Sequence, residues 1–320
     1  MRTTVLAGGV GGAKLVWGLA QVLAPEELTI LGNTGDDLTH LGLTICPDLD
    51  TVMYTLAGMA DPDSGWGVKG DSFGAMESVA RYRGSTWFRL GDQDLGTHLA
   101  RTELLAAGLT LTQVTAHLCH ALGVRQRLLP MADQPAPTLV DTAEGVLSFQ
   151  EWFVRRRWQP AVRKVILPLP RPAASSQVLE ALDMADLILI APSNPLVSVA
   201  PILNVSSVRE ALESRQRMVV AVSPIIGGRA VKGPAAKMMA QLGMEVSPLG
   251  VARWYGAGLL SGLVLDQADE SLTPAIEALG IAALPASTWM RTDSDRIGLA
   301  SCILDWVGSM RPDLNQKGAR

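Results

Sequence analysis

The stretch that decides the fold is residues 1–15, MRTTVLAGGVGGAKL. A β-prone run, Thr3–Ala7, leads through four glycines into a segment with helical spacing, Ala13–Val22. A strand that enters a helix through glycine presents unpaired backbone N–H groups and the positive helix end, which together favour an anion such as phosphate. The spacing matches neither the G-x-G-x-x-G fingerprint nor the G-x-x-x-x-G-K-[ST] loop. We predict a phosphate-binding turn, with a ligand-free turn as the alternative. Its glycines are Gly8, Gly9, Gly11 and Gly12.

Other short apolar runs predict strands that are buried on both faces. They are Leu28–Gly32, Lys164–Leu167, Asp186–Ile190 and Met218–Val222. Segments with helical spacing lie between or after them, including Ser176–Met184, Val205–Ser214 and Gly233–Leu242. This alternation is typical of an α/β fold with a doubly wound, mostly parallel, Rossmann-like sheet. We predict one α/β domain over residues 1–320, with a mainly helical insertion at residues 52–128 over the strand ends.

Composition narrows the class of protein. Hydrophobic residues make up 48% of the chain and charged residues 18%, so a large core can form and disorder is excluded. The net charge of −4 argues against a nucleic-acid-binding surface. No apolar stretch reaches the ~18 residues of a membrane span. The three cysteines, Cys46, Cys119 and Cys302, lack metal-ligand spacing and suit a reducing compartment. We expect a cytoplasmic homodimer that binds neither nucleic acid nor membrane.

Four carboxylates follow the second predicted strand within fifteen positions. Asp36 and Asp37 end the turn Gly32-Asn-Thr-Gly-Asp-Asp37, and Asp48 and Asp50 open a helical segment. Adjacent carboxylates repel one another unless a cation or hydrogen-bond donors offset them. Beside a phosphate turn, such hard oxygen ligands favour Mg²⁺. An Asx turn and a helix N-cap are the alternatives.

Further polar groups occur where later strands end, which is where open α/β sheets bind ligands. They are Ser193, Asn194, Ser223, Gly227, Gly228 and Lys232. Within the insertion, Arg89 suits a planar or anionic ligand group, with a salt bridge to Asp92 or Asp94 as the alternative. The nearby His98 is expected to be structural. The residues alone thus indicate a protein that binds a nucleotide or diphosphate, with Mg²⁺ as cofactor.

Eight ordered motifs extend this interpretation. They are GGVGGAKL, NTGDD, CPDLDTVMYTLAG, WFRLGDQDLGTH, LPMAD, FQEWFV, APSNPLVSV and SPIIGGRAVKGPAAKMM. Over Val5 to about Tyr255 the chain resembles the 2-phospho-L-lactate transferases of coenzyme F(420) biosynthesis. The resemblance implies transfer of a 2-phospholactyl or phosphoenolpyruvyl group from a guanosine diphosphate diester. The acceptor would be the ribityl hydroxyl of 7,8-didemethyl-8-hydroxy-5-deazariboflavin (Fo), and GMP would leave.

The resemblance also assigns roles to residues. Asp50 and Arg89 match the Fo-contacting positions, and Asp50 would also act in catalysis and, with Asp37, in holding Mg²⁺. The opening glycines would cradle the donor phosphates, and Asn33, Asp36 and Asp37 would line the floor. The nucleotide would lie among Ser193, Asn194, Ser223, Gly227, Gly228 and Lys232.

One alternative shares the expected fold. Nucleotide-sugar-binding regulators of bacterial carbon metabolism also open with a glycine-rich strand–helix turn, and they bind without catalysing. They resemble this chain less in the CPDLDT, WFRLGD and SPIIGG segments. Val10 and Ala13 replace a threonine and a proline of some transferases, which leaves the donor's three-carbon acid open.

Overall fold

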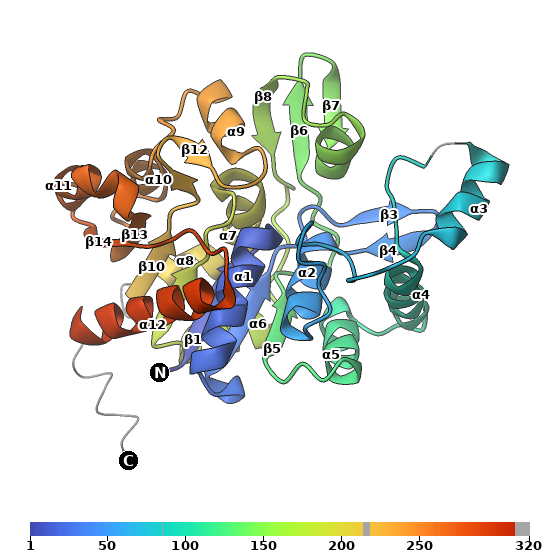
Figure 1. The fold of residues 1–320 in the computed structure, drawn as a ribbon, viewed down its shortest axis with the longest axis horizontal. Coiled ribbons are helices and arrows are strands. Elements are labelled where there is room, and N and C mark those ends of the chain that lie inside the picture. The colour runs from blue at the N-terminus through green and yellow to red at the C-terminus, as the bar shows by residue number, and fades with distance from the viewer. Residues whose placement is uncertain (85, 214–217, 311–320) are drawn as a thin grey trace.

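The structure is a computed structural model that describes residues 1–84, 86–213 and 218–310. The described residues contain a seven-stranded parallel sheet in the order β14-β13-β10-β9-β1-β2-β5 (Figure 1). Its strands are β1 (Thr3–Ala7), β2 (Leu28–Gly32), β5 (Arg127–Pro130), β9 (Leu187–Ile190), β10 (Met218–Val222), β13 (Gly262–Asp266) and β14 (Ala282–Ala286). The predicted Rossmann-like α/β class is confirmed.

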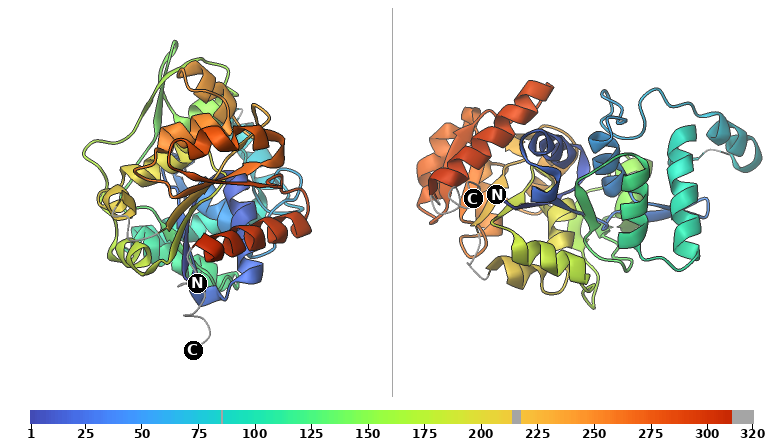
Figure 2. Two further views of the ribbon diagram at one scale, coloured as in Figure 1. Left: turned by 90° about the vertical axis from the view of Figure 1, so that its left-hand side faces the viewer. Right: turned by 90° about the horizontal axis from the view of Figure 1, so that it is seen from below.

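Alternate strand residues face opposite layers of helices. Val5 of β1 pairs with Ile30 of β2, and both side chains pack against α1 (Gly9–Val22) in the core on the first face of the sheet. The next residue, Leu6, belongs to the core on the second face. The first face also carries α2 (Pro47–Leu56), α5 (Leu111–Ala121) and α12 (Asp293–Met310). The second carries α6 (Ser176–Met184), α7 (Ala200–Asn204), α8 (Val208–Glu213), α9 (Ala235–Gln241), α10 (Pro248–Tyr255) and α11 (Thr273–Glu277). Figure 2 shows the two layers edge-on.

The order of strands creates a switch point at β1. The chain passes from β1 to β2 on one side, and it later returns to β9 on the other side. Open α/β sheets bind ligands outside the carboxyl ends of the strands at such a switch point. The glycine turn and the predicted Ser193 loop lie at these strand ends, and we call this region the crevice.

Residues 33–126 separate β2 from β5. They form the hairpin β3 (Leu38–His40) and β4 (Leu43–Ile45), followed by α2, α3 (Gly74–Arg83), α4 (Asp92–Ala106) and α5. The hairpin, α3 and α4 project from one end of the molecule, opposite α10, α11 and α12 (Figure 1). A small core of Ile45, Met76 and Leu90 holds this projection together.

One predicted strand was misplaced. Lys164–Leu167 was expected in the central sheet, but β8 (Val162–Ile166) pairs antiparallel with β6 (Leu139–Thr142), which also pairs with β7 (Gly145–Ser148). The consecutive residues Arg163 and Lys164 are both exposed, so this strand is not covered on both faces and suits an antiparallel sheet outside the central one. The end of the predicted helix at Ser214 lies outside the described residues.

The described chain has six further short elements. They are the pair β11 (Ile225–Ile226) and β12 (Arg229–Ala230), and the 3₁₀ turns Pro25–Glu27 and Gln267–Leu272. Two π-helical turns occupy Glu151–Arg155 and Pro195–Val199. Within residues 1–84, 86–213 and 218–310, no helix has the length and apolar character needed to span a bilayer.

Helix α1 packs closely against α12. A Cβ placed on Gly18 would lie 2.2 Å from the Arg296 carbonyl oxygen, so only glycine allows this approach. The Lys14 ammonium on α1 also donates to the carbonyl of Met290, 3.0 Å away. The helix that follows the glycine turn is therefore held by the last helix of the described chain.

We predict opposite effects from two glycine substitutions. Gly18→Ala should lower the free energy of unfolding by about 1–3 kcal/mol, because α12 must shift away from the added methyl group. Gly298→Ala, at an exposed position in α12 where a Cβ meets nothing within 4 Å, should raise it by about 0.5–1 kcal/mol through helix propensity. Chemical denaturation measures both, and equal effects would contradict the tight α1–α12 contact.

Candidate active site

The exits of β1 and β9 interlock through the glycine turn. The Gly8 N–H donates to Ser193 Oγ at 3.1 Å, and the same hydroxyl donates to the Gly8 carbonyl at 2.7 Å. A Cβ on Gly12 would lie 2.8 Å from Ser193 Oγ, and one on Gly11 would lie 2.7 Å from the Pro192 carbonyl oxygen. The turn therefore needs glycine because the β9 loop lies directly against it.

A carboxylate of the protein lies at the same turn. The Gly9 N–H donates to Asp48 Oδ1 at 2.6 Å, and Gly9 has a φ of 65°, which favours glycine. A Cβ on Gly8 would meet Asp48 Oδ2 at 2.5 Å. The predicted contacts of phosphate with Gly8 and Gly9 stay predictions, and a phosphate would compete there with Ser193 and Asp48.

Asn33 joins two buried acids at the end of β2. Its Nδ2 donates to Asp36 Oδ1 at 2.6 Å and to Asp48 Oδ2 at 2.9 Å. Its Oδ1 accepts from the Gly35 N–H at 2.8 Å, which fixes the orientation of the amide. Gln150 donates to the second oxygen of Asp36 at 3.2 Å. The exits of β1, β2 and β9 thus meet in one polar cluster, as the sequence predicted.

Burial changes the acidity of this cluster. Burial raises the pKa of Asp36 well above its usual range, and the neighbouring Asp48 and Asp37 carboxylates raise it further. Burial also raises the pKa of Asp48, although Asn33 and the Gly9 N–H oppose the change. Burial raises the pKa of Asp37 well above its ordinary value, against the Cys46 thiol and Arg101. Its Oδ1 is buried and has no hydrogen-bond partner in the described chain.

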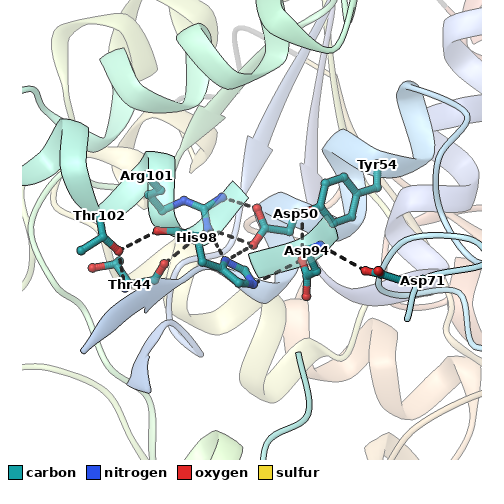
Figure 3. A network of polar contacts seen from close by, with 8 residues as sticks. All are labelled: Thr44, Asp50, Tyr54, Asp71, Asp94, His98, Arg101 and Thr102. Atoms are coloured by element: carbon teal, nitrogen blue, oxygen red, sulfur yellow. Dashed lines mark hydrogen bonds and ion pairs between the residues drawn. The ribbon is translucent and has the colours of Figure 1, made fainter. Parts of the chain in front are cut away.

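Asp50 lies in the first part of α2, where Arg101 from α4 grips its carboxylate. Arg101 Nη1 donates to Asp50 Oδ2 at 3.1 Å, and Nη2 contacts Oδ1. His98, Asp94 and Tyr54 extend this contact into the network of Figure 3. Sequence reasoning missed Arg101. Asp94, His98 and Arg101 recur at intervals of four and three, which places them on one helix face and was the available signal.

Arg89 lies on the loop before α4 and makes no described contact with this network. Its exposed guanidinium stacks on the Phe73 ring, with Cζ 4.1 Å from the ring centroid. The alternative of a salt bridge to Asp92 or Asp94 is wrong, because no such ion pair occurs in the described chain. The two residues that precede Arg89 also make ring contacts: Trp87 packs edge-on against His40, and Phe88 packs against His40 at a tilt. An aromatic surface therefore adjoins a guanidinium without a carboxylate partner there.

The groups after β9 and β10 mostly bond within their own loops. Asn194 Oδ1 caps the π-helical turn through the Leu196 N–H at 3.0 Å, and Ser223 Oγ bonds to the backbone of Ile225 at 3.1 Å. The Gly227 N–H donates to Asp269 at 2.9 Å. Gly228, with a φ of 73°, completes the β11–β12 turn.

Lys232 connects two distant loops across the first turn of α1. Its ammonium donates to the Ser64 carbonyl, and the next residue, Gly65, lies against Val10. Burial lowers the pKa of Lys232, and Asp61 opposes the change. Lys232 thus lies beside the glycine turn. Asn194, Ser223, Gly227 and Gly228 make no described contact with that turn.

The comparisons with known proteins decide the family. The sequence pattern of 2-phospho-L-lactate transferase CofD matches residues 3–279. The chain belongs to the CofD family. It is a transferase enzyme, and the family places it in a phosphate-transferase role of coenzyme F(420) biosynthesis. The suspected resemblance is confirmed.

Similar proteins of known name support the same family assignment. This CofD chain is 43% identical over 302 residues to a phosphoenolpyruvate transferase of Streptomyces griseus, covering 92% of this chain and 94% of the relative. It is 39% identical over 301 residues to a 2-phospho-L-lactate transferase of Methanosarcina mazei, covering 94% and 98%. A crystal structure of a UPF0052-family protein from Bacillus halodurans shares the fold, with a TM-score of 0.57 at 16% identity, covering 89% of this chain and 92% of that one.

We predict that Asn33 stabilises this CofD chain. Asn33→Ala should lower the free energy of unfolding at pH 7–8 by about 2–4 kcal/mol, because two buried carboxylates lose a donor. The amide favours the charged acids, so the loss should shrink as the pH falls and they take up protons. The control Asn204→Ala, which removes one bond to the Pro168 carbonyl, should cost about 1 kcal/mol or less. A loss independent of pH would contradict this role.

Proposed function

We propose that this CofD chain transfers a 2-phospholactyl or phosphoenolpyruvyl group from a guanosine diphosphate diester to the ribityl hydroxyl of Fo. The hydroxyl oxygen forms a bond to the phosphorus that bears the three-carbon acid. The bond from that phosphorus to the GMP oxygen breaks, and GMP leaves. The observation that carries the proposal is the 43% identity, over 92% of the chain, to a phosphoenolpyruvate transferase.

The crevice supports this chemistry because phosphoryl transfer depends on position and charge more than on a covalent nucleophile. The glycine turn and the neighbouring Lys232 are proposed to bind the donor phosphates. Asn194, Ser223, Gly227 and Gly228 are proposed to surround the nucleotide. When the nucleotide binds, the polar groups of these residues would exchange their present hydrogen bonds within the protein for hydrogen bonds to the nucleotide.

Asp50 is proposed to bind and orient the attacking hydroxyl of Fo. Arg101 already occupies one lone pair on each of its oxygens, which leaves a lone pair on each oxygen to accept a hydrogen bond from the attacking hydroxyl. Its main contribution is to orient this hydroxyl, and it accepts the hydroxyl proton as the new bond forms.

Among the acids of the crevice, a single carboxylate is proposed to bind Mg²⁺. Among the described residues, no group of three or more His, Cys, Asp or Glu side chains is arranged to hold a metal ion. Mg²⁺ commonly uses one or two carboxylates, waters and substrate phosphates, so a single acid suffices. Asp37, with its unpartnered buried Oδ1, fits this role, whereas Asp50 would share its oxygens with Arg101. Bound there, Mg²⁺ would neutralise phosphate charge.

The alternative of a nucleotide-sugar-binding regulator receives less support. The solved UPF0052-family structures share the fold at 16–17% identity, which says nothing of function. The relatives at 39–43% identity are transferases.

We predict GMP release from the purified protein with Mg²⁺, Fo and a guanylylated donor. Chromatography measures GMP and the F(420)-0 or dehydro product, and parallel reactions with lactyl, enolpyruvyl and glyceryl donors identify the preferred acid. Omitting Fo should abolish release. No GMP with any donor, or tight binding of UDP-sugars without Fo binding, would overturn the proposal.

We predict that Arg89 and Asp50 affect different steps. Arg89→Ala should weaken Fo binding about 10-fold, roughly the worth of one charged contact, as measured by deazaflavin fluorescence. The control Arg127→Ala removes an exposed arginine that pairs with Glu180 at the amino ends of the strands, and it should leave Fo affinity unchanged.

Asp50→Asn should lower kcat far more than it raises the donor KM. Equal losses in both would indicate a structural cap.

A further inference from the structure

A buried row of polar side chains on α4 faces Asp50 and Tyr54 of α2 (Figure 3). Asp94, His98 and Arg101 form the row, and the Arg101 and His98 side chains are 2% and 1% exposed. Nothing in the comparisons assigns a role to these residues. Charged and polar side chains seldom occur this deep unless their partners are fixed.

Arg101 determines the plane of the Asp50 carboxylate. Its two terminal nitrogens contact the two carboxylate oxygens, which is the forked geometry that only arginine provides. Nη1 also lies 3.5 Å from the Thr44 carbonyl oxygen. The hairpin and α4 are tied together beside it, since Thr102 Oγ1 accepts from the Thr44 N–H at 2.9 Å and donates to the His98 carbonyl at 2.7 Å.

The contact between Arg101 and His98 fixes the imidazole tautomer. Arg101 Nη1 lies 3.1 Å from His98 Nδ1, and a guanidinium can only donate. Nδ1 must therefore accept, which leaves the ring proton of neutral His98 on Nε2. This atom lies 3.2 Å from Asp94 Oδ1, although it meets no hydrogen-bond geometry. The same Asp94 oxygen accepts from the Tyr54 hydroxyl at 2.8 Å.

We propose that Arg101, itself held by His98, is a positioning residue that fixes the Asp50 carboxylate for group transfer. This inference rests on the proposed function, because it concerns how Asp50 meets the acceptor hydroxyl. A buried ion pair rarely stabilises a fold more than apolar residues of similar volume would. Transfer, in contrast, loses rate steeply when a reacting group is misplaced by about 1 Å.

A double-mutant cycle tests the proposal through GMP release. Asp50→Asn and Arg101→Gln should each lower kcat by about 100-fold, with the donor KM changed less than about 3-fold. If Arg101 acts through Asp50, the double variant should be no slower than the slower single variant. Losses that multiply in the double variant would overturn the positioning role. Arg127→Gln in the Asp50→Asn background is the matched control and should have no effect.

Two further variants protect the test against misfolding. Arg101→Lys keeps the charge without the fork, so it should fold, as judged by its thermal transition, and still lose kcat about 10-fold or more. Wild-type kcat in this variant would overturn the proposal. His98→Gln, which keeps an acceptor for Nη1, should lose less kcat than His98→Leu, and equal losses would contradict the role of His98. An active wild type with a failed cycle refutes positioning alone, whereas an inactive wild type refutes the proposed function and this inference together.

Discussion

The crevice depends on one constraint, which is that two buried carboxylates share a single amide donor. The charged carboxylates of Asp36 and Asp48 would repel each other strongly in the protein interior, where the dielectric constant is low. Asn33 offsets this repulsion by donating a hydrogen bond to each of them. Asp48 then accepts from the Gly9 N–H, so the same amide indirectly orders the glycine turn. The Gly8–Ser193 exchange adds the β9 loop. Three strand exits are thus joined by a few hydrogen bonds.

The acids of this region differ in their surroundings and therefore in what they can do. Asp36 and Asp48 are satisfied by neutral donors and raised in pKa by burial, which suits a structural role. Asp50 is paired with a cation, the Arg101 guanidinium, which contacts both of its oxygens and fixes its orientation. Asp37 has an oxygen without a protein partner in the described chain, which suits a ligand from solution. Four neighbouring aspartates in the sequence thus separate into three environments.

The parts of the fold that local chemistry controls could be predicted from sequence. Thr3–Ala7 and Leu28–Gly32 were predicted as they occur, because each is a short apolar run bounded by polar or glycine residues. The strand at residues 164–167 was misplaced because an apolar run does not reveal whether one face or two are covered. β5, β13 and β14 were missed. β5 and β14 each contain proline, and none of the three is rich in β-branched residues. Likewise, the Asp50–Arg101 pair spans 51 positions, and only the tertiary fold that places α4 beside α2 brings it together.

The close contact of Gly18 with Arg296 affects the surroundings of the glycine turn as well as stability. Arg296 and Met290 lie after residue 279, where the family pattern ends, yet they touch the helix that carries the glycine turn. Burial lowers the pKa of Lys14 on that helix, and the positive charges of Arg296 and Lys232 lower it further. A substitution in this last segment can therefore change the rigidity of α1 and the electric field at its first turn, and so act on the crevice from outside it.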